Sequence, residues 1–428
     1  MSRKIGFWSL LALVTGSQIG SGIFMLPANL AAFGYFGLLG WVISGVGAIA
    51  LALVFAKLCG WFPKTGGPHA YALEAFGNTA GFFTGWTYWV VSWVSTTAVI
   101  VASVGYLSPI FGPFSPNETL LWQLGLLAAV TWLNLQGVYA AGRTEFVLTV
   151  LKFIPLIILP ILGLIYFNGA NIQTTPSVAS MPVSKIISHV VLLTLWGFIG
   201  LESGTTPADS VENPSKTIPK AIILGTITVA IVYFFNSLGI LGSMPSSELA
   251  LSKAPYADAT QHILGGQWHL LVSLIASILC IGTLNAWALA SGQIALGLAQ
   301  DGLGPKILGR TNRHNAPYIA ICTAACGIVP LLFLTTHTTL ADQIATIIDF
   351  SVTAFLFVYV TACLAFFKIL RHKQEQTLGA WIYGLVALGF CLWILSETSL
   401  RTLGVAALFA LSGLPVLGWM RTRPSPPV

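Results

Sequence analysis

Long apolar stretches separated by short polar segments make up most of this chain. Stretches of about 20 apolar residues, the length that crosses a bilayer as a helix, recur along the whole sequence. They predict twelve transmembrane helices, at residues 5–31, 35–57, 79–107, 119–137, 144–167, 186–208, 219–243, 268–299, 316–336, 343–369, 379–396 and 402–420. Helices satisfy their backbone hydrogen bonds internally, as lipid requires. We therefore expect an all-α integral membrane protein.

The first apolar stretch contains a segment that interrupts its helical pattern. Gly20, Ser21 and Gly22 lie together at mid-depth, and Pro27 follows. Glycine costs about 1 kcal/mol in a helix interior, and proline removes a backbone donor. Taken alone, the cluster has two interpretations. It is either a break in the helix or a notch for close packing of small residues against a neighbouring helix.

The sixth apolar stretch repeats the pattern. Gly200 and Pro207 are seven residues apart, as are Gly20 and Pro27, and the two pairs are separated by 180 residues. The two stretches would cross the membrane in opposite directions, one in each half of the chain. Interrupted helices at matching positions of two inverted halves indicate a transporter. We therefore expect breaks whose free N–H and C=O groups hold a carboxylate and an ammonium group.

Composition and charge support a membrane protein without a nucleic-acid partner. Of the 428 residues 56% are hydrophobic and 7% are charged, against about 25% charged in soluble domains. If the N-terminus is cytoplasmic, the outer loops hold only Lys185, Lys253 and Arg401, while Lys152 falls within a span. All other lysines and arginines then lie inside, as the positive-inside rule requires. This explains the net charge of +6 and predicts a multi-pass protein of the cell (inner) membrane with both termini cytoplasmic.

The cysteines and the N-terminus give no sign of a metal site or a removed leader. The six cysteines have no framework spacing, so we interpret them as small reduced hydrophobic residues. Cys322 and Cys326 share a helix face, but no histidine or carboxylate is near them in sequence. Arg3 and Lys4 precede a long apolar run without a small-residue cleavage signal, which indicates a retained first span. We expect no metal and no cofactor.

We single out four ionisable residues within the predicted spans: Lys152, His189, Glu202 and Asp349. A charge at the bilayer centre costs roughly 2.5–3.5 kcal/mol on insertion scales. His189 and Asp349 lie near the predicted outer ends, so we interpret them as interfacial polar residues. Lys152 is nine residues past Arg143, roughly 13 Å deep at 1.5 Å per residue. A functional role is favoured for Lys152 over snorkelling to the inner surface, and also for Glu202, which follows the second break.

Three further passages resemble a known family of transporters: "FPKTGGPHAYALEAFG" at 62–77, "TLWGFIGLESGTTPADSVENPSKTIPKAI" at 194–222 and "AWALASGQIALGLAQDGLGP" at 286–305. With the first break, they resemble the amino acid–polyamine–organocation superfamily, and within it the bacterial basic amino acid/polyamine antiporters such as the arginine–agmatine exchanger. The resemblance covers nearly the whole chain.

The resemblance implies the LeuT-like fold, with helices 1 and 6 broken in two inverted five-helix repeats. The whole chain would form one transmembrane domain. Repeat one would cover about 5–167, repeat two about 186–370 and a peripheral hairpin about 371–428. A homodimer in the lipid bilayer is also implied.

The resemblance also implies roles for backbone groups at the two breaks. Ser21 and Gly22 would donate N–H groups to the substrate carboxylate. The carbonyls of Gln18, Trp196 and Ile199 would accept from the substrate ammonium. The Trp196 ring would in addition cover the aliphatic part of the substrate as a gate.

Further side chains receive roles by the same resemblance. Trp287 would offer its ring to a cationic group, a contact of about 0.5–2 kcal/mol. Tyr88, Ser92 and Thr96 are spaced four residues apart and so share one helix face, which would point toward the site. Glu202 would belong, with Tyr88, to a layer that gates the site and senses protons.

Four positions depart from the arginine exchangers. Thr96 stands where they have asparagine, and Ser17–Gln18 replaces an Asn–Ile pair. Lys152 stands where these antiporters have an apolar residue, whereas proton-coupled amino acid transporters of the wider superfamily have a lysine. A specific guanidinium pocket is therefore not implied, and proton coupling through Lys152 stays open.

Two transport mechanisms remain. One is exchange of a cationic amino acid for its amine product or for another amino acid. The other is symport of an amino acid with a proton through Lys152. An enzyme is not expected, because the chain has no H-E-x-x-H motif, no G-x-S-x-G motif and no clustered carboxylates. A channel would more naturally show a repeated filter than paired broken helices.

Overall fold

The computed structural model describes residues 4–112, 114–252, 254–335, 340–373 and 376–421. The predictions for Arg3, Lys253 and Arg423 lie outside these residues. The described chain is a helical bundle, and its only β contacts are two isolated bridges, Ile5–Val211 and Phe33–Thr174. The expected all-α fold class is confirmed.

The long helices follow the order predicted from hydropathy. Those of the first half are α1 (Phe7–Gln18) with α2 (Ser21–Ala31), α3 (Tyr35–Trp61), α5 (Asn78–Val94) with α6 (Thr96–Gly105), α8 (Pro116–Leu135) and α9 (Val138–Ile165). Those of the second half are α11 (Val183–Leu195), α12 (Pro214–Ser243), α15 (Trp268–Gln300), α16 (Tyr318–Thr335) and α17 (Leu340–His372). The chain ends with α18 (Leu378–Glu397), α19 (Leu400–Leu411) and α20 (Leu414–Arg421).

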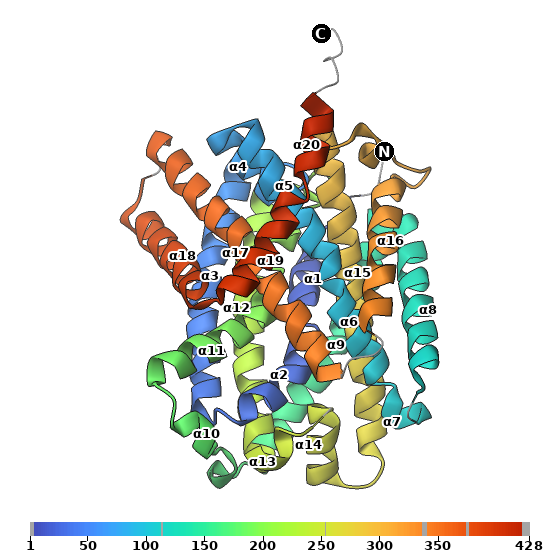
Figure 1. Cartoon of the computed structure of the whole chain (residues 1–428), viewed down its shortest axis with the longest axis vertical. Helices are drawn as coiled ribbons and strands as arrows, with labels where there is room; N and C mark the ends of the chain where they lie inside the picture. Colours follow the sequence, from blue (N-terminus) through green and yellow to red (C-terminus); the bar gives the residue numbers. More distant parts are fainter. Residues whose placement is uncertain (1–3, 113, 253, 336–339, 374–375, 422–428) are drawn as a thin grey trace.

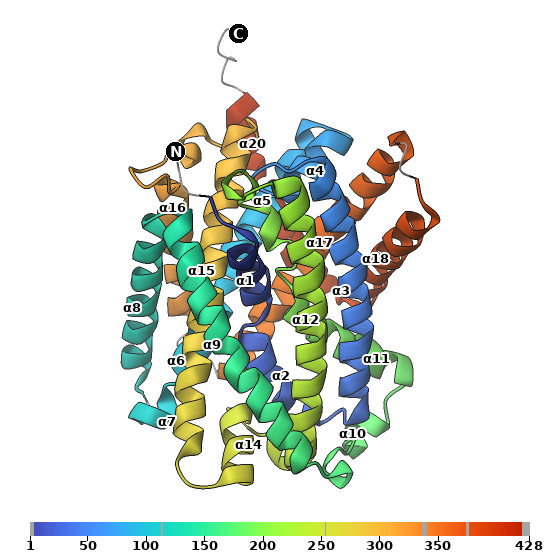
Figure 2. The same cartoon turned by 180° about the vertical axis from the view of Figure 1, so that it is seen from behind.

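Ten helical segments in the described part of the chain are long and apolar enough to cross a membrane. Two more helices complete the twelve predicted spans. The apolar helix α16 is slightly shorter than the others, and the 20 residues of α8 reach about 30 Å, the thickness of the hydrocarbon layer. Figures 1 and 2 show α8 and α16 side by side at one edge of the bundle, and α18 at the opposite edge.

Short helices connect the spans at both ends of the bundle. They are α4 (Pro68–Phe76), α7 (Ser108–Phe111), α10 (Pro176–Ala179), α13 (Ser246–Leu249) and α14 (Pro255–Leu264). In Figure 1, α4 lies at the same end as α20, whereas α7, α10, α13 and α14 lie at the other end.

The first span is broken as expected. Helix α1 ends at Gln18, Ile19 and Gly20 have non-helical backbone angles, and α2 begins at Ser21. Helix α1 packs against α9, α12 and α15, so the break lies inside the bundle and not against lipid. Irregular backbone at this depth is tolerated only where protein surrounds it.

The sixth span is also broken, and its second half differs from a regular helix. Helix α11 ends at Leu195, a 3₁₀ turn covers Trp196–Phe198, and Ile199 is extended. Gly200 has a φ of +106°, which favours glycine because a side chain would be strained there. Two further 3₁₀ turns, Ser203–Thr205 and Ala208–Ser210, take the place of a second half-helix.

The loop after α3 supports these turns from the α4 end of the bundle. The N–H of Gly66 donates to the carbonyl of Thr206 at 2.9 Å. The N–H of Asp209 donates to the hydroxyl of Thr65 at 3.0 Å. The loop therefore binds the irregular half of the sixth span through one backbone group and one side chain, both to the backbone of that span.

A charged contact fastens the same loop to the end of α15. His69 Nε2 lies 2.9 Å from Asp301 Oδ2, and the His69 side chain is fully buried. Gly66 has a φ of +99°, and a Cβ on it would overlap the His69 ring. The hydrogen bond from His69 holds the pKa of Asp301 below its ordinary value.

Asp301→Asn tests this contact through the pH dependence of stability. The pKa of Asp301 is lower in the folded than in the unfolded protein, so its charge stabilises the fold above the unfolded pKa of about 3.9. That contribution disappears as the pH falls through the folded-state pKa. In thermal unfolding in detergent, the wild type should exceed Asp301→Asn near neutral pH, by about 1 kcal/mol at most because Asp301 is partly exposed.

The difference in stability between the wild type and Asp301→Asn should disappear as the pH falls below about 4. Glu74→Gln is the control, because Glu74 is exposed on α4 of the same loop, and it should have little effect at any pH. A difference between wild type and Asp301→Asn that stays constant from neutral to acid pH would contradict the assignment.

Candidate functional site

The two breaks lie against one another at the centre of the bundle, joined through Ser17. Its hydroxyl lies 3.0 Å from the carbonyl oxygen of Gly200 and 2.7 Å from the hydroxyl of Ser203. The indole N–H of Trp287 on α15 donates to the Ser17 carbonyl at 3.1 Å. The end of α1, the turn after α11 and the middle of α15 are thereby held together.

A small enclosed cavity lies where these elements meet. Its lining comes from both breaks, from the junction of α5 and α6, and from α15: Ser17, Gln18, Gly20, Gly22, Ser95, Val99, Trp196, Ile199, Thr283 and Trp287. The water-accessible space is about 20 Å³, enough for about one water molecule. The structure is therefore closed around this site.

The cavity brings together most of the residues with expected backbone roles. Gln18, Gly22, Trp196 and Ile199 line it, and Ser21 is the first residue of α2. The carbonyl of Gln18 already accepts the Tyr233 hydroxyl at 2.6 Å, which leaves a second lone pair for a ligand. The start of α2, whose first N–H groups have no partner within their helix, and residues of both breaks therefore lie around one cavity.

The residues expected from the third span are placed differently. Ser95 and Val99 line the central cavity, whereas Thr96 lines a second small cavity that shares Trp287 with the first. The hydroxyl of Ser92 donates to the carbonyl of Trp89. Ser95, between α5 and α6, keeps helical backbone angles and its N–H donates to the Val91 carbonyl. The face at the central cavity is therefore that of Ser95 and Val99, one residue away from the face of Ser92 and Thr96. The roles of Ser92 and Thr96 in binding remain predictions.

Glu202 lies in a layer of aromatic residues next to the cavity. Its Oε2 accepts the hydroxyl of Tyr359 on α17 at 2.6 Å, and it interacts electrostatically with Tyr88. Phe355 contacts the rings of Tyr88, Tyr359 and Trp287, with centroids 6.0, 6.2 and 5.3 Å apart. The aromatic layer therefore connects the buried carboxyl group to the cavity wall.

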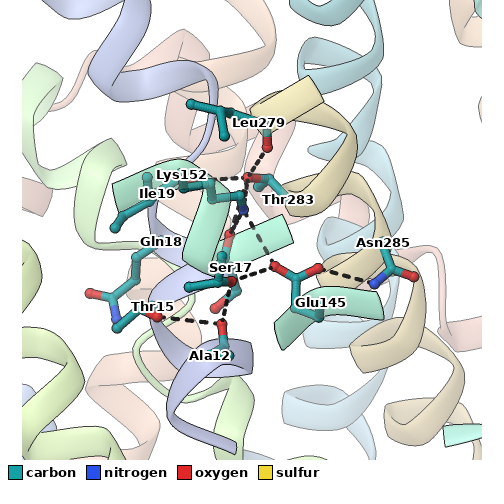
Figure 3. A network of polar contacts seen from close by, with 12 residues as sticks. Ala12, Thr15, Ser17, Gln18, Ile19, Glu145, Lys152, Leu279, Thr283 and Asn285 are labelled. Atoms are coloured by element: carbon teal, nitrogen blue, oxygen red, sulfur yellow. Dashed lines mark hydrogen bonds and ion pairs between the residues drawn. The ribbon is translucent and has the colours of Figure 1, made fainter. Parts of the chain in front are cut away.

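Lys152 reaches the first break from α9, as Figure 3 shows. Its Nζ donates to the carbonyl of Gly16 at 2.9 Å and to the hydroxyl oxygen of Thr283 at 3.1 Å. The hydroxyl of Thr283 donates in turn to the Ile19 carbonyl at 2.7 Å. The two helices α9 and α15 thereby satisfy carbonyl groups that the break leaves without intrahelical partners.

Glu145 is a buried charged residue that the sequence reasoning missed. Its Oε1 lies 3.4 Å from Lys152 Nζ, and both side chains have no exposed surface. The fifth span was expected to begin at 144, which put Glu145 at the interface, but α9 begins at Val138. The spacing of seven residues between Glu145 and Lys152, two helical turns, is the signal that could have paired them.

The other two ionisable residues predicted within spans, His189 and Asp349, lie outside this network, and His189 is exposed. His189 stacks on Phe33 with ring centroids 5.2 Å apart, and it interacts electrostatically with Asp349. In the part of the chain that the structure describes, no three His, Cys, Asp or Glu side chains gather as metal ligands would.

The fold and the site define a class of protein. Interrupted helices that meet at mid-depth around a closed cavity, with buried charges beside the breaks, are the architecture of a secondary transporter. The chain belongs to the amino acid permease family, whose model matches residues 5–416. The resemblance that the motifs suggested is thereby confirmed, and the protein is a multi-pass membrane transporter, not an enzyme.

Several characterised proteins are similar to the chain over most of their length. The cadaverine/lysine antiporter of Escherichia coli (strain K12) is 34% identical over 78% of this chain and 76% of its own. The putrescine transporter PotE of Haemophilus influenzae is 31% identical over 87% of this chain and 86% of its own. PotE of Escherichia coli (strain K12) is 29% identical over 98% of this chain and 95% of its own.

Gly200→Ala tests whether the second break forms the site. A Cβ at this position would lie 2.9 Å from Ser17 Oγ and 3.1 Å from a ring carbon of Trp287, and the positive φ adds strain of about 1–2 kcal/mol. We expect substrate binding to weaken by about tenfold or more, because this strain and crowding displace the cavity wall. Binding is measured on purified protein by scintillation proximity with labelled substrate.

Gly302→Ala is the matched control. Gly302 also has a positive φ, +70°, but a Cβ there would meet open space. The Gly302→Ala variant should be less stable than the wild type but bind substrate with the same affinity. Equal affinities of the Gly200→Ala and Gly302→Ala proteins would show that the glycine at the second break is not needed for the site.

Proposed function

We propose that the protein is an antiporter that exchanges a cationic amino acid for its decarboxylated amine or for another amino acid. The observation that carries this proposal is the closed cavity between two broken helices in a chain similar to a cadaverine/lysine antiporter. Lysine and cadaverine differ only by the carboxyl group. A site that binds both in turn would couple the entry of one to the exit of the other.

The two ends of an amino acid match the polar groups of the breaks. The N–H groups of Ser21 and Gly22 would bind the carboxylate, favoured by the partial positive charge at the start of α2. The carbonyls of Gln18, Trp196 and Ile199 would accept from the ammonium group. An amine product lacks the carboxylate and would retain only the second set of contacts.

The distal cation of the substrate would meet aromatic surface. The residues that line the described cavity carry no charge, so no carboxylate there selects a single cationic group. Trp287 would provide a cation–π contact, and Trp196 would cover the aliphatic part. Ser92 and Thr96 would affect specificity from the third span.

The aromatic layer around Glu202, next to the cavity, would act as the inner gate. Glu202 accepts a hydrogen bond from Tyr359 and lies near Tyr88. Protonation of Glu202 would change this contact, so we assign proton sensing to Glu202 and gating to Tyr88. Symport of a proton through Lys152 is the alternative, supported by the bond from Lys152 to the Gly16 carbonyl, but the names of the relatives favour exchange.

The surroundings of the transporter follow from the charge pattern. Lysines and arginines concentrate on one side of the sequence-predicted spans, so both termini would be cytoplasmic in the cell inner membrane. We assign repeat one to residues 5–167, repeat two to 186–370 and a peripheral hairpin to 371–428. The assembly we propose is a homodimer surrounded by membrane lipid.

Counterflow in proteoliposomes tests this function. Vesicles are loaded with lysine, ornithine, arginine, cadaverine, putrescine, leucine or alanine, and uptake of labelled lysine is followed. We expect uptake to require an internal cationic substrate, because the empty site would not return across the membrane. Leucine and alanine should support less exchange than the cationic compounds, since they lack the group that Trp287 contacts.

A variant pair tests the aromatic contact in the same assay. Trp287→Leu should reduce lysine exchange by about twofold to thirtyfold, the equivalent of about 0.5–2 kcal/mol. Trp8→Leu changes an exposed tryptophan and should have no such effect. Lysine uptake into empty vesicles under a pH gradient alone would contradict antiport and support the symport alternative.

A further inference from the structure

The buried charge pair of Glu145 and Lys152 has no place in the substrate contacts described above. Neither residue lines the central cavity, yet both are completely buried on α9. Figure 3 shows their network, which extends from the end of α1 to Asn285 on α15. The hydrogen bonds of this network show which of its members carry protons.

The contacts of Lys152 are those of a protonated ammonium group. Its Nζ has three acceptors: the Gly16 carbonyl at 2.9 Å, Thr283 Oγ1 at 3.1 Å and Glu145 Oε1 at 3.4 Å. The nearest acceptors of the Thr283 hydroxyl are two carbonyls, Ile19 at 2.7 Å and Gly16 at 3.1 Å, so its proton has a carbonyl partner and its oxygen can accept from the lysine. Three acceptors match the three N–H groups of an ammonium. A neutral amine would direct its lone pair at one of them.

The contacts of Glu145 are those of an ionised carboxylate. Its Oε1 receives Lys152 and lies 3.1 Å from the Thr149 hydroxyl, and its Oε2 lies 3.0 Å from Asn285 Nδ2. The Asn285 amide is oriented by the Ala141 carbonyl, to which the same nitrogen donates at 3.1 Å. Its NH₂ group, not its oxygen, therefore faces Glu145. The Thr149 hydroxyl also has the Ala12 carbonyl within reach, at 3.2 Å. The lysine and the amide are the donors in their contacts, and each meets a different carboxyl oxygen, as expected for an ionised carboxylate.

Few other ionisable groups face this pair. From α15, the thiol of Cys280 interacts electrostatically with Lys152. Helix α1 contains no ionisable residue, α8 contributes the Asn134 amide, and the Tyr233 hydroxyl of α12 is bonded to the Gln18 carbonyl. The Tyr256 hydroxyl of α14 is bonded to Asn236. The remaining ionisable residues of the helices packed on α9 lie near helix ends: Glu118, Lys216, Lys220, Asp258, His262 and His269. Arg143 on α9 is exposed.

We propose that Glu145 is a positioning residue that keeps Lys152 protonated at the first break throughout the transport cycle. Its carboxylate neutralises the ammonium inside the protein, so the bond from Lys152 to the Gly16 carbonyl does not depend on the outside or inside pH. Transport then moves no proton through this site. The inference rests on the proposed exchange function and specifies why exchange would be independent of protons at Lys152.

Glu145→Gln tests the proposal through the pH profile of exchange. The glutamine keeps the shape of the side chain but removes the charge that holds the proton on Lys152. Counterflow is measured at equal internal and external pH between about pH 6 and about pH 8. The wild type should vary little, whereas Glu145→Gln should lose about tenfold in rate toward pH 8, because an unpaired buried ammonium gives up its proton.

Two further variants separate the charge from the packing. Thr149→Val removes an uncharged neighbour of the same carboxylate and should keep the wild-type profile. The double variant Glu145→Gln/Lys152→Met removes both charges, and its rate should not depend on pH over this range. A Glu145→Gln profile equal to that of the wild type would overturn the proposal.

Unfolding temperatures test the same pair without transport. Glu145→Gln and Lys152→Met should each lower the unfolding temperature. The double variant should lower it by less than the sum of the two single decreases, since it leaves no unpaired charge. Additive losses would overturn the proposal even if a single variant is too unstable to reconstitute. Absence of counterflow in the wild type would instead contradict the exchange function, and the unfolding temperatures would still test the pair.

Discussion

The hydrogen bond from Lys152 to the carbonyl of Gly16 is the contact on which the first break depends. A helix interrupted in a membrane frees carbonyl groups that lipid cannot satisfy. Here α9 supplies Lys152 for the Gly16 carbonyl. Helix α12 supplies Tyr233 for Gln18, and α15 supplies Thr283 for Ile19. Three neighbouring helices therefore stabilise the irregular segment and fix the end of α1 in place.

The same constraint explains how the rest of the site is arranged. The carbonyls before the break have protein partners, whereas the first N–H groups of α2 have no partner within their own helix. Ser17 then joins the first break to Gly200 and Ser203 at the second. Trp287 contacts Ser17 on one side and Phe355 on the other. A continuous set of contacts thus connects both breaks with the aromatic layer around Glu202.

The sequence predicted those features that depend on the residues of one segment alone. Span lengths follow from hydropathy, and the breaks follow from the matching Gly–Pro pairs, which the structure confirms. Side-chain partners from distant segments could not be predicted in this way. Glu145 was missed because the start of the fifth span was placed at 144 instead of Val138. The rotation of the third span about its axis also could not be predicted, and the structure places Ser95 and Val99 at the cavity in place of Ser92 and Thr96.

The central claim is that substrate binds between the two breaks. An electron cryomicroscopy structure of the protein with bound lysine tests it most directly. The account predicts density that contacts the N–H groups of Ser21 and Gly22 at one end and the carbonyls of Trp196 and Ile199 nearby, with the side chain along Trp287. Lysine bound away from both breaks, with the central cavity still closed around water, would contradict the account.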